Sequence, residues 1–217
     1  MNRTLLAAAV VVVAAAWWWG REQEVFEDDA GDTDSDALPG FLEDAATAVD
    51  QITGGVMSLS AMSRVTAYDL QDRNVQAFLR VIRRGEGTVD EGGYKRIFGG
   101  GTFTSFADHP RVLVVKSGYR STAAGAYQFI QSTWDQTRKV MKLPDFSPAS
   151  QDKGAVGLIA MRGALADVKA GRLEAAIRKC GLEWASLPFS PYGQPVISMD
   201  TARKVFASAG GMELVAA

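Results

Sequence analysis

One carboxylate, Glu86, stands between two glycines in the stretch AFLRVIRRGEGT. Glycine ends helices readily and has no side chain to shield its neighbour. A carboxyl presented there and shielded from water keeps its proton to higher pH, because burial disfavours the charged form. Such an acid can protonate a leaving-group oxygen, as in glycosidic cleavage. From the residues alone, the alternative is an ordinary solvated charge at a helix end.

The helix that must position Glu86 is predicted over residues 74–84. Apolar residues recur there at steps of three and four, which is typical of a helix with one buried face. The residues that form this face are Val75, Phe78, Leu79 and Ile82.

Few other residues offer chemistry, since His109 is the only histidine and Cys180 the only cysteine. A disulfide within the chain and a thiolate metal site are therefore excluded, as is structural zinc, which needs four Cys or His ligands. A Ser-His-Asp triad would have to use His109, which lies in a predicted turn before Pro110. We expect no metal and no cofactor.

The charges divide the chain into parts. Residues 22–63 hold 11 acidic and no basic residues, whereas the chain from Arg64 onward has 21 basic against 14 acidic residues. A modest positive excess suits an anionic partner such as nucleic acid, a membrane surface or a wall polymer. No basic stripe or nucleic-acid-binding motif accompanies it, so we expect no nucleic-acid partner.

An uninterrupted apolar run of 15 residues, Leu5–Trp19, lies near the N-terminus between Arg3 and Arg21. As a helix it would be about 22 Å long, short of a hydrocarbon core of about 30 Å. We favour a signal-anchor with its tryptophans at the inner-membrane interface over a cleaved signal peptide or a soluble cytoplasmic role. Export to the periplasm, with the chain tethered to the inner membrane, is the expected localisation.

Three segments result: an anchor or signal at 1–21, an acidic and largely disordered tether at 22–61, and a folded domain at 62–217. Within the domain, a glycine- and aromatic-rich stretch at 91–115 lacks helical periodicity and predicts a small hairpin. We expect an α+β, mostly α fold, with a groove where the β region meets the helices, and a monomer. Further helices are predicted at 121–141, 147–171, 172–180 and 198–209.

Six ordered stretches of the domain resemble the lambda-type phage endolysins, lytic transglycosylases of the lysozyme-like superfamily. They are AFLRVIRRGEGT, IFGGGTFTSFADHPRVLV, STAAGAYQF, DFSPASQD, RGAL and WASLPFSPYGQ. The resemblance implies a lysozyme-like fold, peptidoglycan as the substrate, and Glu86 as the acid. It also nominates Tyr127 and Gln128, because AAGAYQF is similar to the motif with which lytic transglycosylases hold the N-acetylated sugar.

The family's chemistry implies that one carboxylate suffices. The acid protonates the glycosidic oxygen, the sugar's N-acetyl oxygen stabilises the cationic centre, and the C6 hydroxyl closes on C1. Glycosidases ordinarily use two carboxylates. The nearby acids are Asp90 and Glu91, expected to be solvated at a loop tip, and Asp108, which either caps a turn or lines the cleft.

Other residues are candidate substrate contacts with structural alternatives. Ser121 and Thr122 either cap the following helix or reach the sugar. Tyr192 and Gln194 lie in a proline-rich loop suited to one lip of a cleft, and Phe103 belongs either to the opposing lip or to the core. We expect the neighbouring Phe106 in the core.

Rival functions remain open at this point. A hydrolytic muramidase would use water and a second acid, a wall-binding module would grip glycan without cleaving it, and the enzyme could serve either host lysis or wall opening by the virion. An acidic tether that folds back onto the basic domain is a further hypothesis.

Overall fold

The computed structural model describes residues 59–116 and 119–214, and its central element is helix α4 (Arg73–Gly85). The side chain of Asp72 begins this helix, because its carboxylate accepts hydrogen bonds from the backbone N–H groups of Asn74 and Val75. All four apolar residues of the predicted face are buried. The helix predicted over 74–84 is therefore confirmed, one residue longer at each end.

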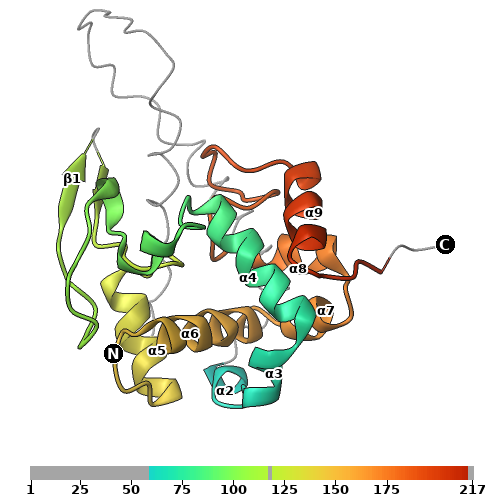
Figure 1. Ribbon diagram of the computed structural model, residues 1–217, viewed down its shortest axis with the longest axis horizontal. Coiled ribbons are helices and arrows are strands. Elements are labelled where there is room, and N and C mark those ends of the chain that lie inside the picture. The colour runs from blue at the N-terminus through green and yellow to red at the C-terminus, as the bar shows by residue number, and fades with distance from the viewer. Residues whose placement is uncertain (1–58, 117–118, 215–217) are drawn as a thin grey trace, which may run out of the picture.

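Helices α6 (Pro148–Met161), α7 (Leu165–Lys169) and α9 (Met199–Ser208) pack against α4, and α6 lies below it in the view of Figure 1. Ser147 caps α6 with Pro148 in its first turn, as the Ser-Pro pair predicts. The remaining helices are α2 (Leu59–Met62), α3 (Ala67–Gln71), α5 (Gln131–Met141) and α8 (Leu173–Cys180).

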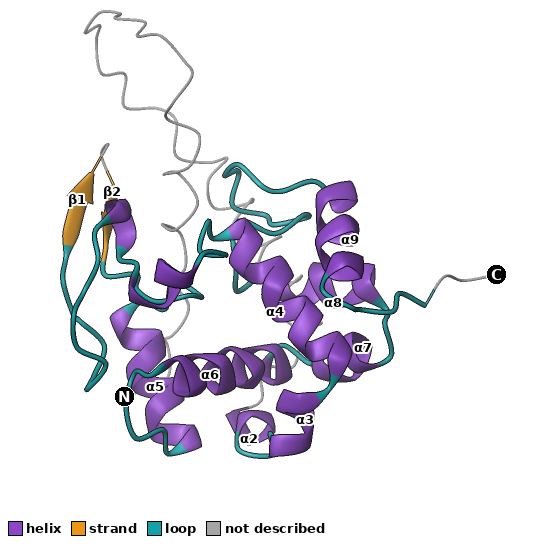
Figure 2. Cartoon of the chain, viewed as in Figure 1, coloured by secondary structure: helices purple, strands orange, loops and turns teal. Residues whose placement is uncertain are grey.

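The β region is a two-stranded antiparallel hairpin at one edge of the molecule (Figure 2). Strand β1 (Val114–Lys116) pairs with β2 (Tyr119–Ser121), with Val114 opposite Ser121. The hairpin predicted over 91–115 was therefore placed too early: only its last two residues belong to β1, and the stretch before them contains the 3₁₀ turns Glu91–Lys95 and Phe98–Gly100. Gly99 and Gly100 have φ of 86° and 92°, a conformation that glycine adopts without strain.

The predicted helix over 121–141 begins only at Gln131, so its first half was wrong. Gly125 and Gln128 have φ of 80° and 47°, which a right-handed helix does not permit. Ala124 instead forms isolated bridges with Ile97 and Phe129. The segment is thereby a tight turn tied to the β region, and it brings Tyr127 and Gln128 beside the end of α4.

The fold class is confirmed: the described residues are mostly helical with one small antiparallel sheet. Within these residues no helix is long and apolar enough to cross a membrane. The predicted anchor at 5–19 and nearly all of the tether lie outside the described residues, and both stay predictions.

Candidate active site

Glu86 is the residue that follows α4, and the glycines on both sides of it have separate roles. Its backbone N–H still donates to the carbonyl of Ile82 at 2.9 Å, which holds it to the end of the helix. Gly87 turns the chain away with φ of 67°. Gly85 leaves room for another segment, because a Cβ there would lie 2.4 Å from the hydroxyl oxygen of Ser186.

The two carboxyl oxygens of Glu86 have different surroundings. Oε1 accepts a hydrogen bond of 2.6 Å from the Ser186 hydroxyl. Oε2 is buried and has no hydrogen-bond partner in the described part of the chain. Burial raises the pKa of Glu86 to about 7, although the Ser186 hydrogen bond lowers it in part. A group that titrates near neutral pH can exchange a proton with a substrate at that pH.

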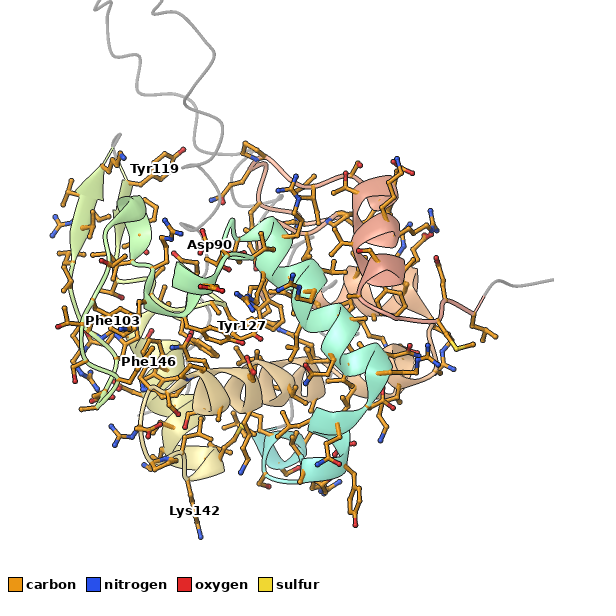
Figure 3. All side chains as sticks on the ribbon, in the orientation of Figure 1. Asp90, Phe103, Tyr119, Tyr127, Lys142 and Phe146 are labelled. Atoms are coloured by element: carbon orange, nitrogen blue, oxygen red, sulfur yellow. The ribbon has the colours of Figure 1, made fainter. Side chains whose placement is uncertain are left out.

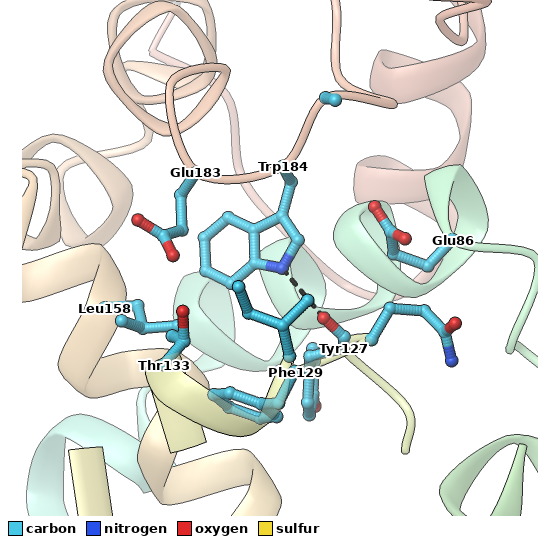
Figure 4. A pocket seen from close by; sticks show the side chains of 10 residues that line it. Glu86, Tyr127, Phe129, Thr133, Leu158, Glu183 and Trp184 are labelled. Atoms are coloured by element: carbon cyan, nitrogen blue, oxygen red, sulfur yellow. Dashed lines mark hydrogen bonds between the residues drawn. The ribbon is translucent and has the colours of Figure 1, made fainter. Parts of the chain in front are cut away.

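Glu86 lines a pocket that holds about 430 Å³ of empty space, part of it open to solvent. In the view of Figure 4, the Trp184 indole lies between Glu86 and Glu183. The lining therefore combines two acids with apolar and aromatic surface, a combination suited to a sugar ring. The lining residues are Glu86, Tyr127, Gln128, Phe129, Ile130, Thr133, Leu158, Glu183, Trp184 and Ala185.

Tyr127 lines this pocket, but its hydroxyl is bound elsewhere. That hydroxyl donates to Asp152 at 2.6 Å, and Tyr94 donates to the same carboxylate oxygen at 2.8 Å. The Tyr127 carbonyl accepts from the indole N–H of Trp184 at 3.2 Å (Figure 4). Tyr127 thus fixes the position of Trp184 through its backbone, while its ring is buried.

Gln128 lies at the pocket wall in a left-handed backbone conformation. Its side-chain amide donates to the carbonyl of Gly125 at 2.9 Å, which closes the turn. The structure therefore brings together Glu86, Tyr127 and Gln128 of the residues that the sequence nominated.

A substitution at Gly125 tests how tightly this turn is built. A Cβ at Gly125 would lie 2.3 Å from Oε1 of Gln151, the atom that accepts from the backbone N–H of Ala126. We expect Gly125→Ala to destabilise the domain by about 3 kcal/mol, from backbone strain plus displacement of a buried hydrogen bond. Chemical denaturation measures this loss.

Gly163→Ala is the matched control, because Gly163 has φ of 67° and no atom within 4 Å of its added Cβ. The Gly163→Ala variant should lose only the free energy of backbone strain, about 1 kcal/mol. Equal losses in the two variants would show that the contact with Gln151 contributes nothing.

The other nominated residues lie outside the pocket lining, and three of them make contacts elsewhere in the fold. Ser121 is buried in β2, and its hydroxyl accepts from the backbone N–H of Ala123 at 3.0 Å. The neighbouring Thr122 hydroxyl accepts from the backbone N–H of Gln131 at 3.0 Å, so Thr122 supports the start of α5, whose N-cap position is Ile130. Asp108 accepts from the indole of Trp134 and pairs with Arg111 and Arg138.

The aromatic candidates pack against other rings, and the candidates in the proline-rich loop lie outside the pocket. Phe103 packs against Phe106 and Phe146, each with ring centroids 5.6 Å apart, and its contact with Phe146 ties it to the core (Figure 3). Phe106 is only partly buried, beneath the ammonium of Lys95. The Tyr192 hydroxyl donates to the carbonyl of Leu182 at 3.0 Å, and Gln194 is partly buried in the same loop.

Sequence reasoning missed three residues of the site: Ser186, Trp184 and Glu183. All three lie in the stretch that follows α8. Ser186, for example, is 100 residues from Glu86 in the sequence. The WASLP motif was noted, but nothing in it indicated which side chains face Glu86. A glutamate directly before a tryptophan was the only available signal for Glu183.

Glu183 is the second carboxylate in the pocket wall, and it is already paired. Arg162 donates to its Oε2 through Nε at 2.9 Å and through the terminal nitrogen at 2.7 Å. Burial raises the pKa of Glu183, while the Arg162 charge opposes that rise. Of the other acids considered, Asp90 pairs with Arg96, and Glu91 is exposed.

Known proteins similar to this chain share both its sequence and its fold. A family model described as Endolysin matches residues 76–213. The endolysin of Escherichia phage P2 is 40% identical over 156 residues, which is 64% of this chain and 94% of that protein. The endolysin of Escherichia phage lambda is 43% identical over 144 residues, 63% of this chain and 90% of that protein.

The solved structure of bacteriophage lambda lysozyme complexed with a chitohexasaccharide superposes with a TM-score of 0.63 and 40% identity. The match covers 65% of this chain and 97% of that one. The fold is therefore that of lambda lysozyme, and the chain belongs to the endolysin family.

Proposed function

We propose that this chain is a peptidoglycan lytic transglycosylase that opens the host wall during lysis. It would cleave the bond between N-acetylmuramic acid and N-acetylglucosamine and leave 1,6-anhydro-muramic ends. The observation that carries the proposal is the Glu86 carboxyl in the wall of a pocket, with its pKa raised to about 7. Membership of the endolysin family supports it, as does the chitohexasaccharide bound by lambda lysozyme.

In the proposed reaction Glu86 acts twice. Its protonated form gives a proton to the glycosidic oxygen as the bond from C1 breaks and the electron pair goes to that oxygen. The sugar's N-acetyl oxygen stabilises the positive charge at C1. The Glu86 carboxylate then takes the proton of the C6 hydroxyl while the oxygen of that hydroxyl forms a bond to C1. The acid is regenerated and no water is consumed.

Glu183 supports a second candidate, the hydrolytic muramidase. A hydrolase needs another carboxylate as base or nucleophile, and Glu183 lies in the same pocket wall. We favour the transglycosylase because both hydrogen bonds from Arg162 hold Glu183 in an ion pair. Turning Glu183 toward a sugar or a water would leave the buried Arg162 guanidinium without its anion, so the carboxylate is committed to a structural contact.

Digestion of purified peptidoglycan in H₂¹⁸O distinguishes the two reactions. The transglycosylase produces muropeptides one water lighter than the hydrolytic products, with no ¹⁸O at the new end. Mass spectrometry that finds reducing ends carrying ¹⁸O would replace the transglycosylase by the muramidase.

The rate should fall as pH rises through about 7, because the reaction starts from protonated Glu86. The direction follows from the raised pKa: below it the acid holds its proton, and above it the donor is lost. We expect a tenfold loss for each pH unit above the pKa, in line with simple titration of one group. Initial rates on soluble glycan strands between pH 5 and 9 measure this fall, which is the alkaline limb of the pH–rate profile. A rate that is flat up to pH 9 would contradict the assignment.

A further inference from the structure

The hydroxyl of Ser186 is the polar group that touches the Glu86 carboxyl. Ser186 is buried, at 2% exposure, and its hydroxyl donates to Oε1 at 2.6 Å. Its backbone carbonyl accepts from the N–H of Ile197 at 2.9 Å, which anchors the residue from the other side. The contact is therefore built into the fold by two long-range hydrogen bonds.

The contact also accounts for the glycine before Glu86. A Cβ at Gly85 would lie 2.4 Å from the Ser186 hydroxyl oxygen and 3.1 Å from its Cβ. Since real atoms do not approach so closely, any larger residue at 85 would displace Ser186 or its hydroxyl. The helix thus ends in a residue whose lack of a side chain permits the hydrogen bond.

The two oxygens of a carboxylic acid differ: the carbonyl oxygen is the better acceptor, and the hydroxyl oxygen carries the proton. A donor fixed on Oε1 favours the form in which Oε1 is the carbonyl. Oε2 is then the hydroxyl oxygen, and it is the buried oxygen that lacks a hydrogen-bond partner among the described residues. A buried polar atom left without a partner is a recognised feature of catalytic positions.

We propose that Ser186 is a positioning residue, whose hydroxyl holds Oε1 of Glu86 as the carbonyl oxygen and so places the transferable proton on Oε2. This inference rests on the proposed function. In the proposed reaction this is the proton that passes to the glycosidic oxygen. Because Oε2 is covered in this structure, the substrate has to displace part of that cover to reach it. Ser186 itself gains and loses no proton.

The test compares Ser186→Ala with the unsubstituted chain on soluble glycan strands, with kcat and KM measured across pH. We expect kcat to fall about tenfold, because the acid loses its fixed orientation, while KM changes little. The alkaline limb of the profile should move up by about one pH unit, because the carboxylate loses its donor. A merely structural role would lower the rate without moving that limb.

Gly85→Ala is the second variant, since it keeps the serine but displaces its hydroxyl. It should reproduce both changes, and it should add little to Ser186→Ala in the double variant, because both act on one contact. Ser190→Ala is the matched control: its hydroxyl lies in the same loop, buried and without a hydrogen bond within the described chain. We expect the control to keep the original rate and profile.

The outcomes separate this inference from the proposed function. If Ser186→Ala keeps kcat and the alkaline limb while Glu86→Gln is inactive, only the positioning role is wrong. A rate loss in Ser186→Ala with an unmoved limb also overturns it, as would additive effects in the double variant. If Glu86→Gln stays active, the proposed function itself fails.

Discussion

Replacing Glu86 with glutamine should lower the rate of peptidoglycan cleavage by about a thousandfold. Glutamine keeps the size of the side chain and can still accept from Ser186, but it has no proton to donate to a leaving oxygen. General acid-base groups typically contribute between about 10² and 10⁴ in rate, and here one group serves both steps. Release of soluble glycan fragments from purified walls measures the loss.

Glu91→Gln is the matched control, because Glu91 is an exposed glutamate a short distance along the chain. It should leave the rate unchanged. A Glu86→Gln variant that cleaves walls within tenfold of the original rate would remove Glu86 from the chemistry. An unsubstituted chain that binds walls yet releases no fragments would favour the wall-binding module.

The same substitution should stabilise the fold at alkaline pH, which separates lost chemistry from lost structure. The pKa of Glu86 is about 7 in the folded chain against an ordinary 4.5, so the folded state binds the proton more tightly. Its contribution to stability is therefore present below pH 4.5 and is lost as pH rises through 7. At pH 8.5 we expect Glu86→Gln to unfold with a free energy about 2 kcal/mol higher than the original chain, and the difference should shrink toward pH 5.

Breaking the Arg162–Glu183 pair should also cost the fold much of its stability. The two side chains are 11% and 6% exposed, so replacing Glu183 with leucine leaves a buried guanidinium without its anion. We expect Glu183→Leu to lower the free energy of unfolding by about 3 kcal/mol. For a domain of this size that corresponds to a fall in Tm of about 6 to 12 °C by calorimetry.

The double variant Arg162→Met, Glu183→Leu should recover much of this loss, because it removes both buried charges together. Lys204→Met is the surface control: Lys204 and Asp200 form a pair on α9 that is 77% and 73% exposed, worth less than about 1 kcal/mol. A single Glu183→Leu variant as stable as the Lys204→Met variant would show that the pocket wall does not depend on the ion pair.

Local patterns in the sequence were enough to predict the helix that leads to Glu86 and the short helix α8. The helix α8 was predicted at 172–180, and its residues at helical spacing, Leu173, Ala176, Ile177 and Cys180, are all buried. Helical periodicity and caps are properties of neighbouring residues, so one segment of sequence carries them. The Ser-Pro start of α6 belongs to the same class.

The segment at 121–130 could not be predicted in this way. Its alanines and aromatic residues resemble a helix, but bridges from Ala124 to Ile97 and Phe129 override that preference. Tertiary contacts of this kind are invisible to a local pattern. The same limit applies to the site, because Ser186 and Glu183 reach it from about 100 residues away.

The family resemblance correctly indicated the fold, and the structure places Glu86, Tyr127 and Gln128 on one pocket. It did not indicate how each side chain is used. Tyr127 was nominated as a substrate contact, yet its hydroxyl is committed to Asp152 and its carbonyl supports Trp184. Which atoms of a motif face a substrate depends on three-dimensional packing, which a motif does not encode.

The central claim is that one carboxyl, shielded at the end of α4, holds its proton near neutral pH. Carbon-13 NMR of the carboxyl groups in glutamate-labelled protein measures this directly, with the Glu86→Gln variant identifying the Glu86 signal. We predict that this signal titrates near pH 7, well above the surface glutamates. A Glu86 signal that titrates near pH 4.5, as the solvated carboxylates do, would contradict the account. The acid would then have lost its proton at neutral pH before the reaction could begin.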